Sequence, residues 1–325
     1  MGNSIYRETS QKESLIKVAH MYYIGQMTQE EIAESLNCSR AKVVRMLKDA
    51  KKRNIVTFQI VTPDSYYTDQ AECIRKHFSL KKVVVVPSEN TSDASKRKVA
   101  DAACQYLQTI LHDNMIIGIT WGTTVGKVAK YMPEQQLSGC GVYALNANLS
   151  SQNYYYDSYA IVSDFAAKLH ATKHVIDAPE IVQDKKVRDM LIHGEPRIAH
   201  HFDMFRHMDV AIVGLGTNIA KESTVYQSGN LSLEDVQKLH EQEAVADVVG
   251  IRIMDDGTPA NTFLTDRVIT IPLEDLAEIP DTIAVATGRD KTRSAIAAAR
   301  GHYYNTLFID ETLALSIIAQ ENISP

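Results

Sequence analysis

The sequence lacks the features that would place it in a membrane or in a secretory pathway. No apolar run approaches the roughly 18–20 residues that a membrane-spanning helix needs. Residues 1–14 contain no apolar segment of the kind found in a secretory signal. The four cysteines lie far apart and show no CxxC spacing, which favours reduced thiols. We therefore expect a cytoplasmic protein with no membrane partner.

Common catalytic motifs are also missing. The chain has no G-x-S-x-G elbow, no H-E-x-x-H and no Walker motif, so catalysis has little support from the sequence. The segment VGLGTN (213–218) is not a dinucleotide fingerprint, because Ile219 stands at the sixth position counted from Gly214. We therefore expect no nucleotide cofactor.

Histidines are numerous, and several of them cluster. The cluster consists of His193, His200, His201 and His207, with Asp203 nearby. Their spacing matches no zinc pattern, and histidines that line helices are far commoner than metal ligands. We expect no bound metal.

The net charge of −6 is distributed unevenly along the chain. Residues 1–60 contain ten Lys or Arg and six Asp or Glu, a balance of +4, which leaves −10 for the rest. Residues 39–53 alone contain seven basic residues against one acid, Asp49. A basic segment on an acidic body is typical of a small DNA-binding module attached to a larger domain.

The local sequence between residues 28 and 52 predicts two helices joined by a tight turn. Thr28 and Glu31 form a capping box at the start of the first helix. Asn37 suits the turn, because it tolerates left-handed backbone, and Ser39 suits the N-cap of the second helix. An earlier helix is expected over 12–24.

The second helix has an apolar side and a basic side. Val43, Met46, Leu47 and Ala50 fall on the side expected to pack inward. The opposite side suits a recognition helix, because Arg can bind guanine and lysines can bind phosphates. The candidate contacts to double-stranded operator DNA are Thr28, Ser39, Arg40, Lys42, Val44, Arg45 and Lys48. The alternatives are a solvated surface helix and a helical module used for protein assembly.

After this module the pattern changes. The segment NIVTFQIV (54–61) is β-branched and predicts a strand, which would add a wing to the helices. Pro63 interrupts the pattern, and residues 63–67 are expected to form a hinge. We therefore place a helix-turn-helix domain at 1–60 and a second domain at 61–325.

The second domain alternates predicted strands with predicted helices. Strands are expected at 81–87, 115–120, 141–147, 174–177, 209–216, 248–253, 267–271, 282–287 and 306–310. Helices are expected at 96–111, 157–170, 291–300 and 311–319. This alternation predicts an α/β fold with a mostly parallel sheet covered by helices on both faces. A binding site should lie beyond the carboxyl ends of the strands.

Two loops at such strand ends are candidate binding elements. In ITWGTTVG (119–126), a strand meets Gly122, and Thr123 and Thr124 follow at an expected helix start. Free N–H groups, hydroxyls and the helix dipole suit a phosphate, although an ordinary turn fits the spacing equally well. In ATGRDKTRSAI (286–296), Gly288 permits close approach to a ligand. Lys291 opens a helix, where its charge opposes the dipole and is mildly unfavourable unless an anion is present.

Several segments resemble the SorC family of bacterial sugar-operon regulators. The matching pieces are 22–50, the ITWGTT loop, DVAIVGLGT, DVVGIRIMDDG, TIAVATGRDKTRSAIAAARG and TLFIDETLA, in this order along nearly the whole chain. The resemblance implies a Rossmann-like effector domain, similar in fold to glucosamine-6-phosphate deaminase and ribose-5-phosphate isomerase. It also implies a homodimer or homotetramer that binds operator DNA and a sugar or sugar phosphate.

The resemblance further implies roles for individual residues. The expected effector-binding residues are Gly122, Thr123, Thr124, Asn146, Asp247, Gly288 and Lys291. The chain departs from the family pattern at Val44, at Ala246 and at Asn146 with Asn148, and the last departure suggests an altered sugar preference or an unphosphorylated ligand. The competing hypothesis is a sugar-phosphate isomerase or deaminase with a fused helical module, since a shared fold does not fix function.

Overall fold

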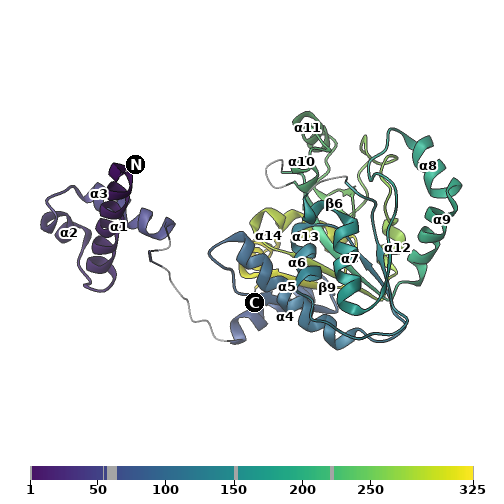
Figure 1. Ribbon diagram of the computed structural model, residues 1–325, viewed down its shortest axis with the longest axis horizontal. Coiled ribbons are helices and arrows are strands. Elements are labelled where there is room, and N and C mark those ends of the chain that lie inside the picture. Colours follow the sequence, from purple (N-terminus) through teal and green to yellow (C-terminus); the bar gives the residue numbers. More distant parts are fainter. Residues whose placement is uncertain (1, 54, 57–63, 150–152, 220–222, 325) are drawn as a thin grey trace. The chain divides into compact units, whose positions relative to one another are not determined.

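The chain forms two compact units, Met1–Thr62 and Pro63–Pro325, in the computed structural model (Figure 1). The structure describes residues 2–53, 55–56, 64–149, 153–219 and 223–324.

The first unit is a three-helix domain with its own small core. It consists of α1 (Gly2–Tyr23), α2 (Gln29–Ser35) and α3 (Arg40–Lys52). Val18, Ile32, Val43 and Leu47 come from all three helices and bury their side chains together. The order of short helix, tight turn and basic helix agrees with the predicted helix-turn-helix.

Local capping signals explain where these helices begin. The Thr28 hydroxyl accepts a hydrogen bond from the Glu31 N–H at 3.3 Å, and the Glu31 carboxylate accepts from the Thr28 N–H at 2.7 Å. Asn37 adopts a left-handed conformation with φ 46°, and Ser39 caps α3 through the Lys42 N–H. The predicted capping box, turn residue and second cap are therefore confirmed.

Three predictions for this region need comment. Helix α1 begins at Gly2, ten residues before the expected start at Lys12. Of the predicted strand 54–61, only 55 and 56 lie within the described residues, and they form a bend. The expected hinge at 63–67 is wrong over most of its length, because α4 (Asp64–His77) begins at Asp64.

A mostly parallel sheet organises the second unit, as the alternating pattern predicts. Its strands are β1 (Lys82–Val86), β2 (Ile116–Ile119), β3 (Gly141–Ala144), β4 (Thr172–His174), β5 (Val210–Thr217), β8 (Asp281–Ala286) and β9 (Thr306–Asp310). They lie in the order β1-β9-β8-β5-β2-β3-β4 and pair in parallel. Two further strands, β6 (Ala246–Val248) and β7 (Ile251–Ile253), extend from β5 as an antiparallel hairpin.

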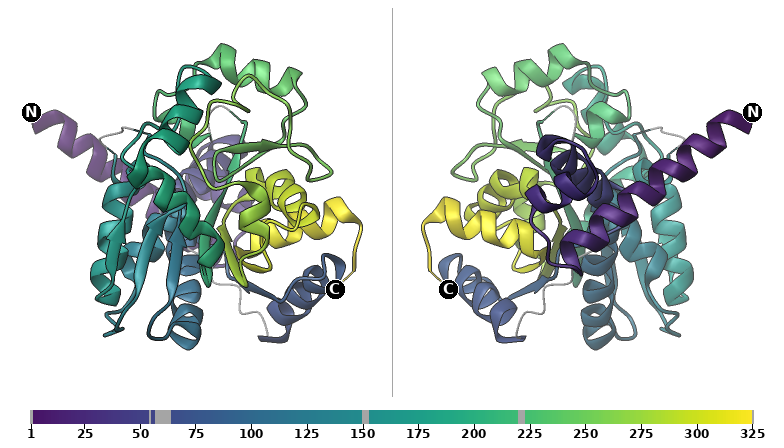
Figure 2. Two further views of the ribbon diagram at one scale, coloured as in Figure 1. Left: turned by 90° about the vertical axis from the view of Figure 1, so that its right-hand side faces the viewer. Right: turned by 90° about the vertical axis from the view of Figure 1, so that its left-hand side faces the viewer.

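Helices cover both faces of this sheet (Figures 1 and 2). One face packs against α5 (Ser92–Ile110), α6 (Thr123–Tyr131) and α7 (Ser158–Leu169). The other face packs against α4, α13 (Thr292–Arg300) and α14 (Glu311–Glu321). Shorter helical segments are α10 (Thr224–Gln227), α11 (Leu233–Glu241), α12 (Leu273–Ala277), η1 (Tyr154–Tyr156), η2 (Met204–His207) and η4 (Arg289–Lys291).

Three strand predictions differ from the structure. The expected strand 248–253 is a hairpin, because Val249 and Gly250 both take positive φ and turn the chain between β6 and β7. The expected strand 174–177 lies two residues earlier, as β4. The expected strand 267–271 is reduced to isolated bridges at Val268 and Thr270. Helices α8 (Lys185–Gly194) and α9 (Pro196–Asp203) were not predicted from the sequence.

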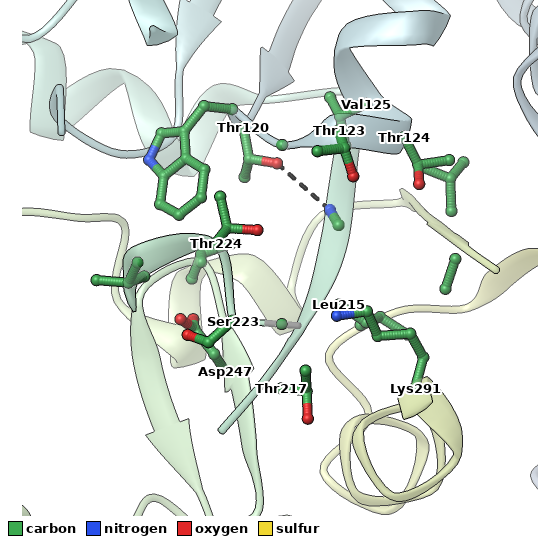
Figure 3. A pocket seen from close by; sticks show the side chains of 18 of the residues that line it. Thr120, Thr123, Thr124, Val125, Leu215, Thr217, Ser223, Thr224, Asp247 and Lys291 are labelled. Atoms are coloured by element: carbon green, nitrogen blue, oxygen red, sulfur yellow. Dashed lines mark hydrogen bonds between the residues drawn. The ribbon is translucent and has the colours of Figure 1, made fainter. Parts of the chain in front are cut away.

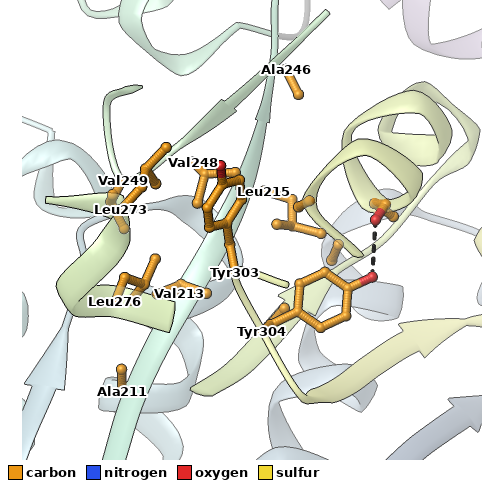
Figure 4. Close-up of a cluster of buried hydrophobic side chains, with 14 of the residues drawn as sticks. Ala211, Val213, Leu215, Ala246, Val248, Val249, Leu273, Leu276, Tyr303 and Tyr304 are labelled. Atoms are coloured by element: carbon orange, nitrogen blue, oxygen red, sulfur yellow. Dashed lines mark hydrogen bonds between the residues drawn. The ribbon is translucent and has the colours of Figure 1, made fainter. Parts of the chain in front are cut away.

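The core on the α13 face combines apolar packing with satisfied tyrosine hydroxyls (Figure 4). Leu276 of α12 and Val213 of β5 pack there beside Tyr303 and Tyr304. The Tyr304 hydroxyl donates to the Ala295 carbonyl at 2.9 Å. Buried hydroxyls that find partners stabilise a core instead of weakening it.

One buried histidine makes the stability of this unit depend on pH. His201 of α9 is 5% exposed, and its Nε2–H donates to the Ala144 carbonyl at 2.8 Å. Burial lowers its pKa to about 4. In the unfolded chain this imidazole is protonated below about pH 6.5, whereas in the folded chain it is protonated only below about pH 4.

We expect the unfolding free energy to fall by up to about 3 kcal/mol as the pH drops from 6.5 to 4, because protonation favours the unfolded chain. Denaturant titrations of the wild type and of His201→Gln at several pH values would measure this. The Gln variant keeps a donor for Ala144 but cannot titrate, so its curve should be flatter. Parallel curves for the two proteins would contradict this role of His201.

Candidate functional site

A pocket lies at the carboxyl ends of β2, β3, β5 and β8, where an open parallel sheet is expected to bind ligands (Figure 3). It encloses about 670 Å³ of empty space, its open mouth included. The loops after these strands supply most of the lining: Thr120 to Val125 after β2, Asn146 after β3, Gly214 to Thr217 at the end of β5, and Thr287 after β8. Lys96, Ser223, Thr224, Asp247 and Lys291 come from other elements.

The N-terminus of α6 forms one wall of the pocket. Gly122 takes φ 143°, a conformation that favours glycine, and so turns the chain from β2 into the helix. No described side chain caps this helix, and Thr123 and Thr124 follow directly at its first turn. The helix therefore presents hydroxyls and the positive end of its dipole to the pocket, which is the arrangement that binds anions.

Charged groups flank this wall. Lys291 lies in η4, and its Nζ is 3.4 Å from the Asp290 carboxylate. Figure 3 shows Lys291 reaching into the pocket from the side opposite α6, while Asp247 stands apart from it on the hairpin side. Lys96 of α5 adds a second cation to the lining. Lys291 and Asp247 thus lie on different sides of the pocket.

Asp247 is held by the β6–β7 hairpin. One carboxylate oxygen lies 2.5 Å from Nη1 of Arg252, and the other accepts from the Gly250 N–H at 2.8 Å. Asp247 and Arg252 are 7% and 4% exposed. Gly216 of β5 pairs with Asp247, and a Cβ built at Gly216 would lie 2.6 Å from the Asp247 Cβ. The absence of a side chain at Gly216 therefore lets Asp247 reach the pocket.

Asn146 belongs to a buried polar group at the β3 side of the pocket. Its Nδ2 donates to Oε2 of Glu180 at 3.3 Å, and Trp121 Nε1 donates to the same oxygen at 2.6 Å. Glu180 is 2% exposed, and burial, followed by the nearby Asp247 carboxylate, raises its pKa well above the usual range. Two other buried oxygens of the lining, Asn146 Oδ1 and Thr287 Oγ1, have no hydrogen-bond partner among the described residues.

Most of the residues that the sequence proposed for the effector come together here. Gly122, Thr123, Thr124, Asn146, Asp247 and Lys291 all line the pocket. Gly288 is not among the lining residues; its φ of 91° and its N–H bond to Asp310 shape the loop that carries Lys291. Sequence reasoning missed Lys96, Trp121, Ser223, Thr224, Thr287 and the buried Glu180. Thr287 could have been found, because it ends a predicted strand.

Apart from Thr28, the proposed DNA contacts lie on the outer side of α3 and at its N-terminus. Ser39, Lys42, Arg45 and Lys48 are exposed, and Val44 is half-buried. Arg40 is exposed too, but its Nε lies 2.9 Å from the Glu30 carboxylate of α2. The Thr28 hydroxyl is engaged in capping α2. Unlike Arg40, the exposed Arg45 and Lys48 of α3 make no ion pair within the described residues.

One member of the histidine cluster, His201, has a structural role. His201 is buried, and it meets the Tyr143 ring edge-on at 5.3 Å between ring centres. His174, outside the cluster, stacks against the same tyrosine with 4.1 Å between the ring centres. Within the described ranges, no group of three or more His, Cys, Asp or Glu side chains is placed to hold a metal ion.

Comparison with known proteins identifies the family. Residues 65–319 match the family model described as "Putative sugar-binding domain". The deoxyribonucleoside regulator of Bacillus subtilis is 26% identical over 304 residues, which are 93% of this chain and 96% of the relative. The chain belongs to the SorC family of sugar-binding transcriptional regulators. The resemblance inferred from the sequence is therefore confirmed.

Two further comparisons concern a single SorC-family regulator. The sorbitol operon regulator of Klebsiella pneumoniae is 24% identical over 309 residues, which are 92% of this chain and 96% of the relative. Its full-length crystal structure superposes with a TM-score of 0.72 at 21% identity, covering 94% of this chain and 98% of that one. The two proteins share the fold of both units. Of the helices that the structure describes, none combines the length and apolar character needed to span a bilayer.

Gly216 offers a test of the pocket geometry in this SorC-family chain. We expect Gly216→Ala to lower the unfolding free energy by about 1–3 kcal/mol, because the new methyl group overlaps Asp247. The matched control is Gly214→Ala on the same strand, where the new Cβ would meet only Val125 at an ordinary 3.5 Å. Denaturant unfolding of both variants measures the effect. Equal stability of the two variants would contradict the close approach of β5 and Asp247.

Proposed function

We propose that the protein regulates a carbohydrate operon by binding a sugar phosphate in the pocket of the second unit and operator DNA through α3. The observation that carries this proposal is the uncapped N-terminus of α6, which opens into a pocket lined by Lys96 and Lys291. The names of two relatives, a sorbitol operon regulator and a deoxyribonucleoside regulator, support the proposal that the regulated operon concerns a carbohydrate.

The α6 end of the pocket suits the phosphate. Backbone N–H groups at a helix start, two threonine hydroxyls and two lysines supply donors and positive charge to an anion. Lys291 sits at the N-cap of α13, where its charge is unfavourable to the helix dipole. A bound phosphate between α6 and Lys291 would offset this cost.

The β3 side of the pocket suits the sugar. Asn146, Asp247 and the Ser223 hydroxyl give both donors and acceptors for sugar hydroxyls. Trp121 contributes an apolar ring to the same lining. This division, with cations at one side and neutral or acidic groups at the other, favours a ligand with one anionic end and one hydroxylated end.

Helix α3 is proposed to enter the major groove of the operator. Its outer side presents Arg45 and Lys48, and its start offers backbone N–H groups to a phosphate. The exposed Arg40–Glu30 pair is weak in water, so a DNA phosphate can replace Glu30 as the partner. As a homodimer or homotetramer, the protein would present two or more such helices to a repeated operator.

The effector acts by differential affinity. A sugar phosphate changes DNA binding only if it binds one oligomeric arrangement more tightly than another. The proposed role of the second unit is therefore to set the spacing of the DNA-binding units within the oligomer.

An enzymatic function has less support from the pocket. In the described part of the lining, the ionisable side chains are Lys96, Asp247 and Lys291. Asp247 is the only carboxylate among them. Its ion pair with Arg252 stabilises the unprotonated form, which makes Asp247 a poor general base. Turnover of ribose or hexosamine phosphates by the purified protein would favour the isomerase or deaminase alternative.

Pocket variants test the effector site. Thr124→Ala and Lys291→Ala should each weaken the response of DNA binding to sugar phosphate by about tenfold or more, because each removes a phosphate contact. Operator affinity without the sugar should stay unchanged. Fluorescence anisotropy with and without the sugar phosphate measures the operator affinity and its response to the effector. The control is Lys130→Ala, because Lys130 is an exposed lysine on α6 outside the pocket lining. A normal response in both pocket variants would reject the site.

A variant of α3 tests the DNA-binding surface. Arg45→Ala should weaken operator binding by about tenfold or more while leaving effector binding intact, because a base contact contributes about 1–3 kcal/mol. Lys17→Ala removes the same charge from the exposed side of α1 and should have a much smaller effect. Equal operator affinity for Arg45→Ala and the wild type would exclude this residue from the groove.

A further inference from the structure

The buried carboxyl group of Glu180 has no role in the function proposed so far. Glu180 lies in the segment between β4 and α8, 34 positions from Asn146 in the sequence. It does not line the pocket, yet it is joined by hydrogen bonds to two residues that do. A buried acid next to a ligand site calls for a physical explanation, because burying such a group is costly.

The hydrogen bonds around Glu180 fix the carboxyl group in one position. Its own backbone is locked, since its N–H donates to the Asn148 carbonyl at 2.9 Å and its carbonyl accepts from the Ile269 N–H at 2.8 Å. Its Oε2 then accepts from Trp121 at 2.6 Å and from Asn146 at 3.3 Å. On the other side, Gly250 leaves the room that Oε1 needs, because a Cβ there would lie within 2.5 Å of this oxygen.

This arrangement orients the amide of Asn146. An amide group is planar, so the position of Nδ2 determines that of Oδ1. With Nδ2 held at Glu180, Oδ1 is directed elsewhere, and it has no hydrogen-bond partner within the described residues although Asn146 is only 1% exposed. A buried acceptor left without a donor costs free energy that a ligand hydroxyl could recover.

We infer that Glu180 is a positioning residue that sets the effector specificity of the pocket: it holds the Asn146 amide so that Oδ1 accepts a hydrogen bond from a hydroxyl group of the sugar. This inference rests on the proposed function. It adds that the end of the effector away from the phosphate must carry a hydrogen-bond donor. Groups that only accept, such as an ether or a second phosphate ester oxygen, do not fit this position.

Strand spacing supports two separate ends of the pocket. Asn146 follows β3 and Thr287 follows β8, and β2 and β5 lie between them. Three strand spacings of about 4.8 Å separate the two positions by roughly 14 Å. The unpartnered oxygen of Asn146 therefore lies at the side of the pocket away from Lys291, where the sugar is proposed to bind.

The test compares two dissociation constants for the full-length protein. Calorimetry gives the constants for inorganic phosphate and for ribose 5-phosphate, glucose 6-phosphate and sorbitol 6-phosphate. The readout is the ratio of the phosphate constant to that of the tightest sugar phosphate. We expect Asn146→Ala and Glu180→Met each to lower this ratio by about tenfold, the effect of one buried hydrogen bond, with the phosphate constant unchanged.

A double-mutant cycle distinguishes positioning from a general structural role. If Glu180 acts through Asn146, Glu180→Met should change the ratio by less than about twofold when Asn146 is already Ala. Additive effects, or an unchanged ratio in Glu180→Met, would overturn the inference. If Glu180→Met fails to fold, Glu180→Gln is measured instead. Gln keeps the oxygen that accepts from Asn146, so the ratio should stay within about threefold of the wild-type value. A loss as large as that of Asn146→Ala would refute the inference.

The same experiment separates this inference from the function on which it rests. If no sugar phosphate binds the wild type more tightly than inorganic phosphate, the proposed function fails and the inference fails with it. If a sugar phosphate binds the wild type tightly but Glu180→Met leaves the ratio of dissociation constants unchanged, only the inference is wrong.

Discussion

The buried ion pair between Asp247 and Arg252 is the interaction on which the pocket depends. Two charges taken out of water are stable only when they are paired and further hydrogen-bonded. Here Gly250 hydrogen-bonds to both partners, because its N–H donates to Asp247 and its carbonyl accepts from Arg252 at 3.0 Å. The pair therefore closes the turn between β6 and β7 and holds one wall of the pocket against β5.

The parallel sheet explains why distant loops meet at one place. All its parallel strands point their carboxyl ends to the same edge, so the loops after β2, β3, β5 and β8 converge there. The pocket obtains a helix N-terminus from one loop, an amide from the next and a lysine from a third. Glycines at Gly122 and Gly216 permit the close turns and contacts that this convergence requires.

The sequence predicted the features that local physics controls. The Thr28 capping box, the Ser39 cap and the strands rich in Val and Ile depend on neighbours in the chain, and they are present as expected. The hairpin at Val249 was missed, because the β-branched residues on both sides of Gly250 suggest one strand and do not reveal a positive φ at a non-glycine residue. Lys96 and Glu180 were missed because their places in the site depend on the order of strands and on a contact across 34 positions, which periodicity does not encode.

Binding of the wild-type protein to its own promoter tests most directly whether it is a sugar-phosphate-controlled regulator. Anisotropy of a labelled promoter fragment would be measured at two salt concentrations, with and without a panel of sugars and sugar phosphates. We predict tight binding that weakens steeply with salt, since phosphate contacts release counterions. We also predict that one sugar phosphate alters this binding. Binding no tighter than to random DNA, or binding that no sugar phosphate changes, would contradict the proposed function.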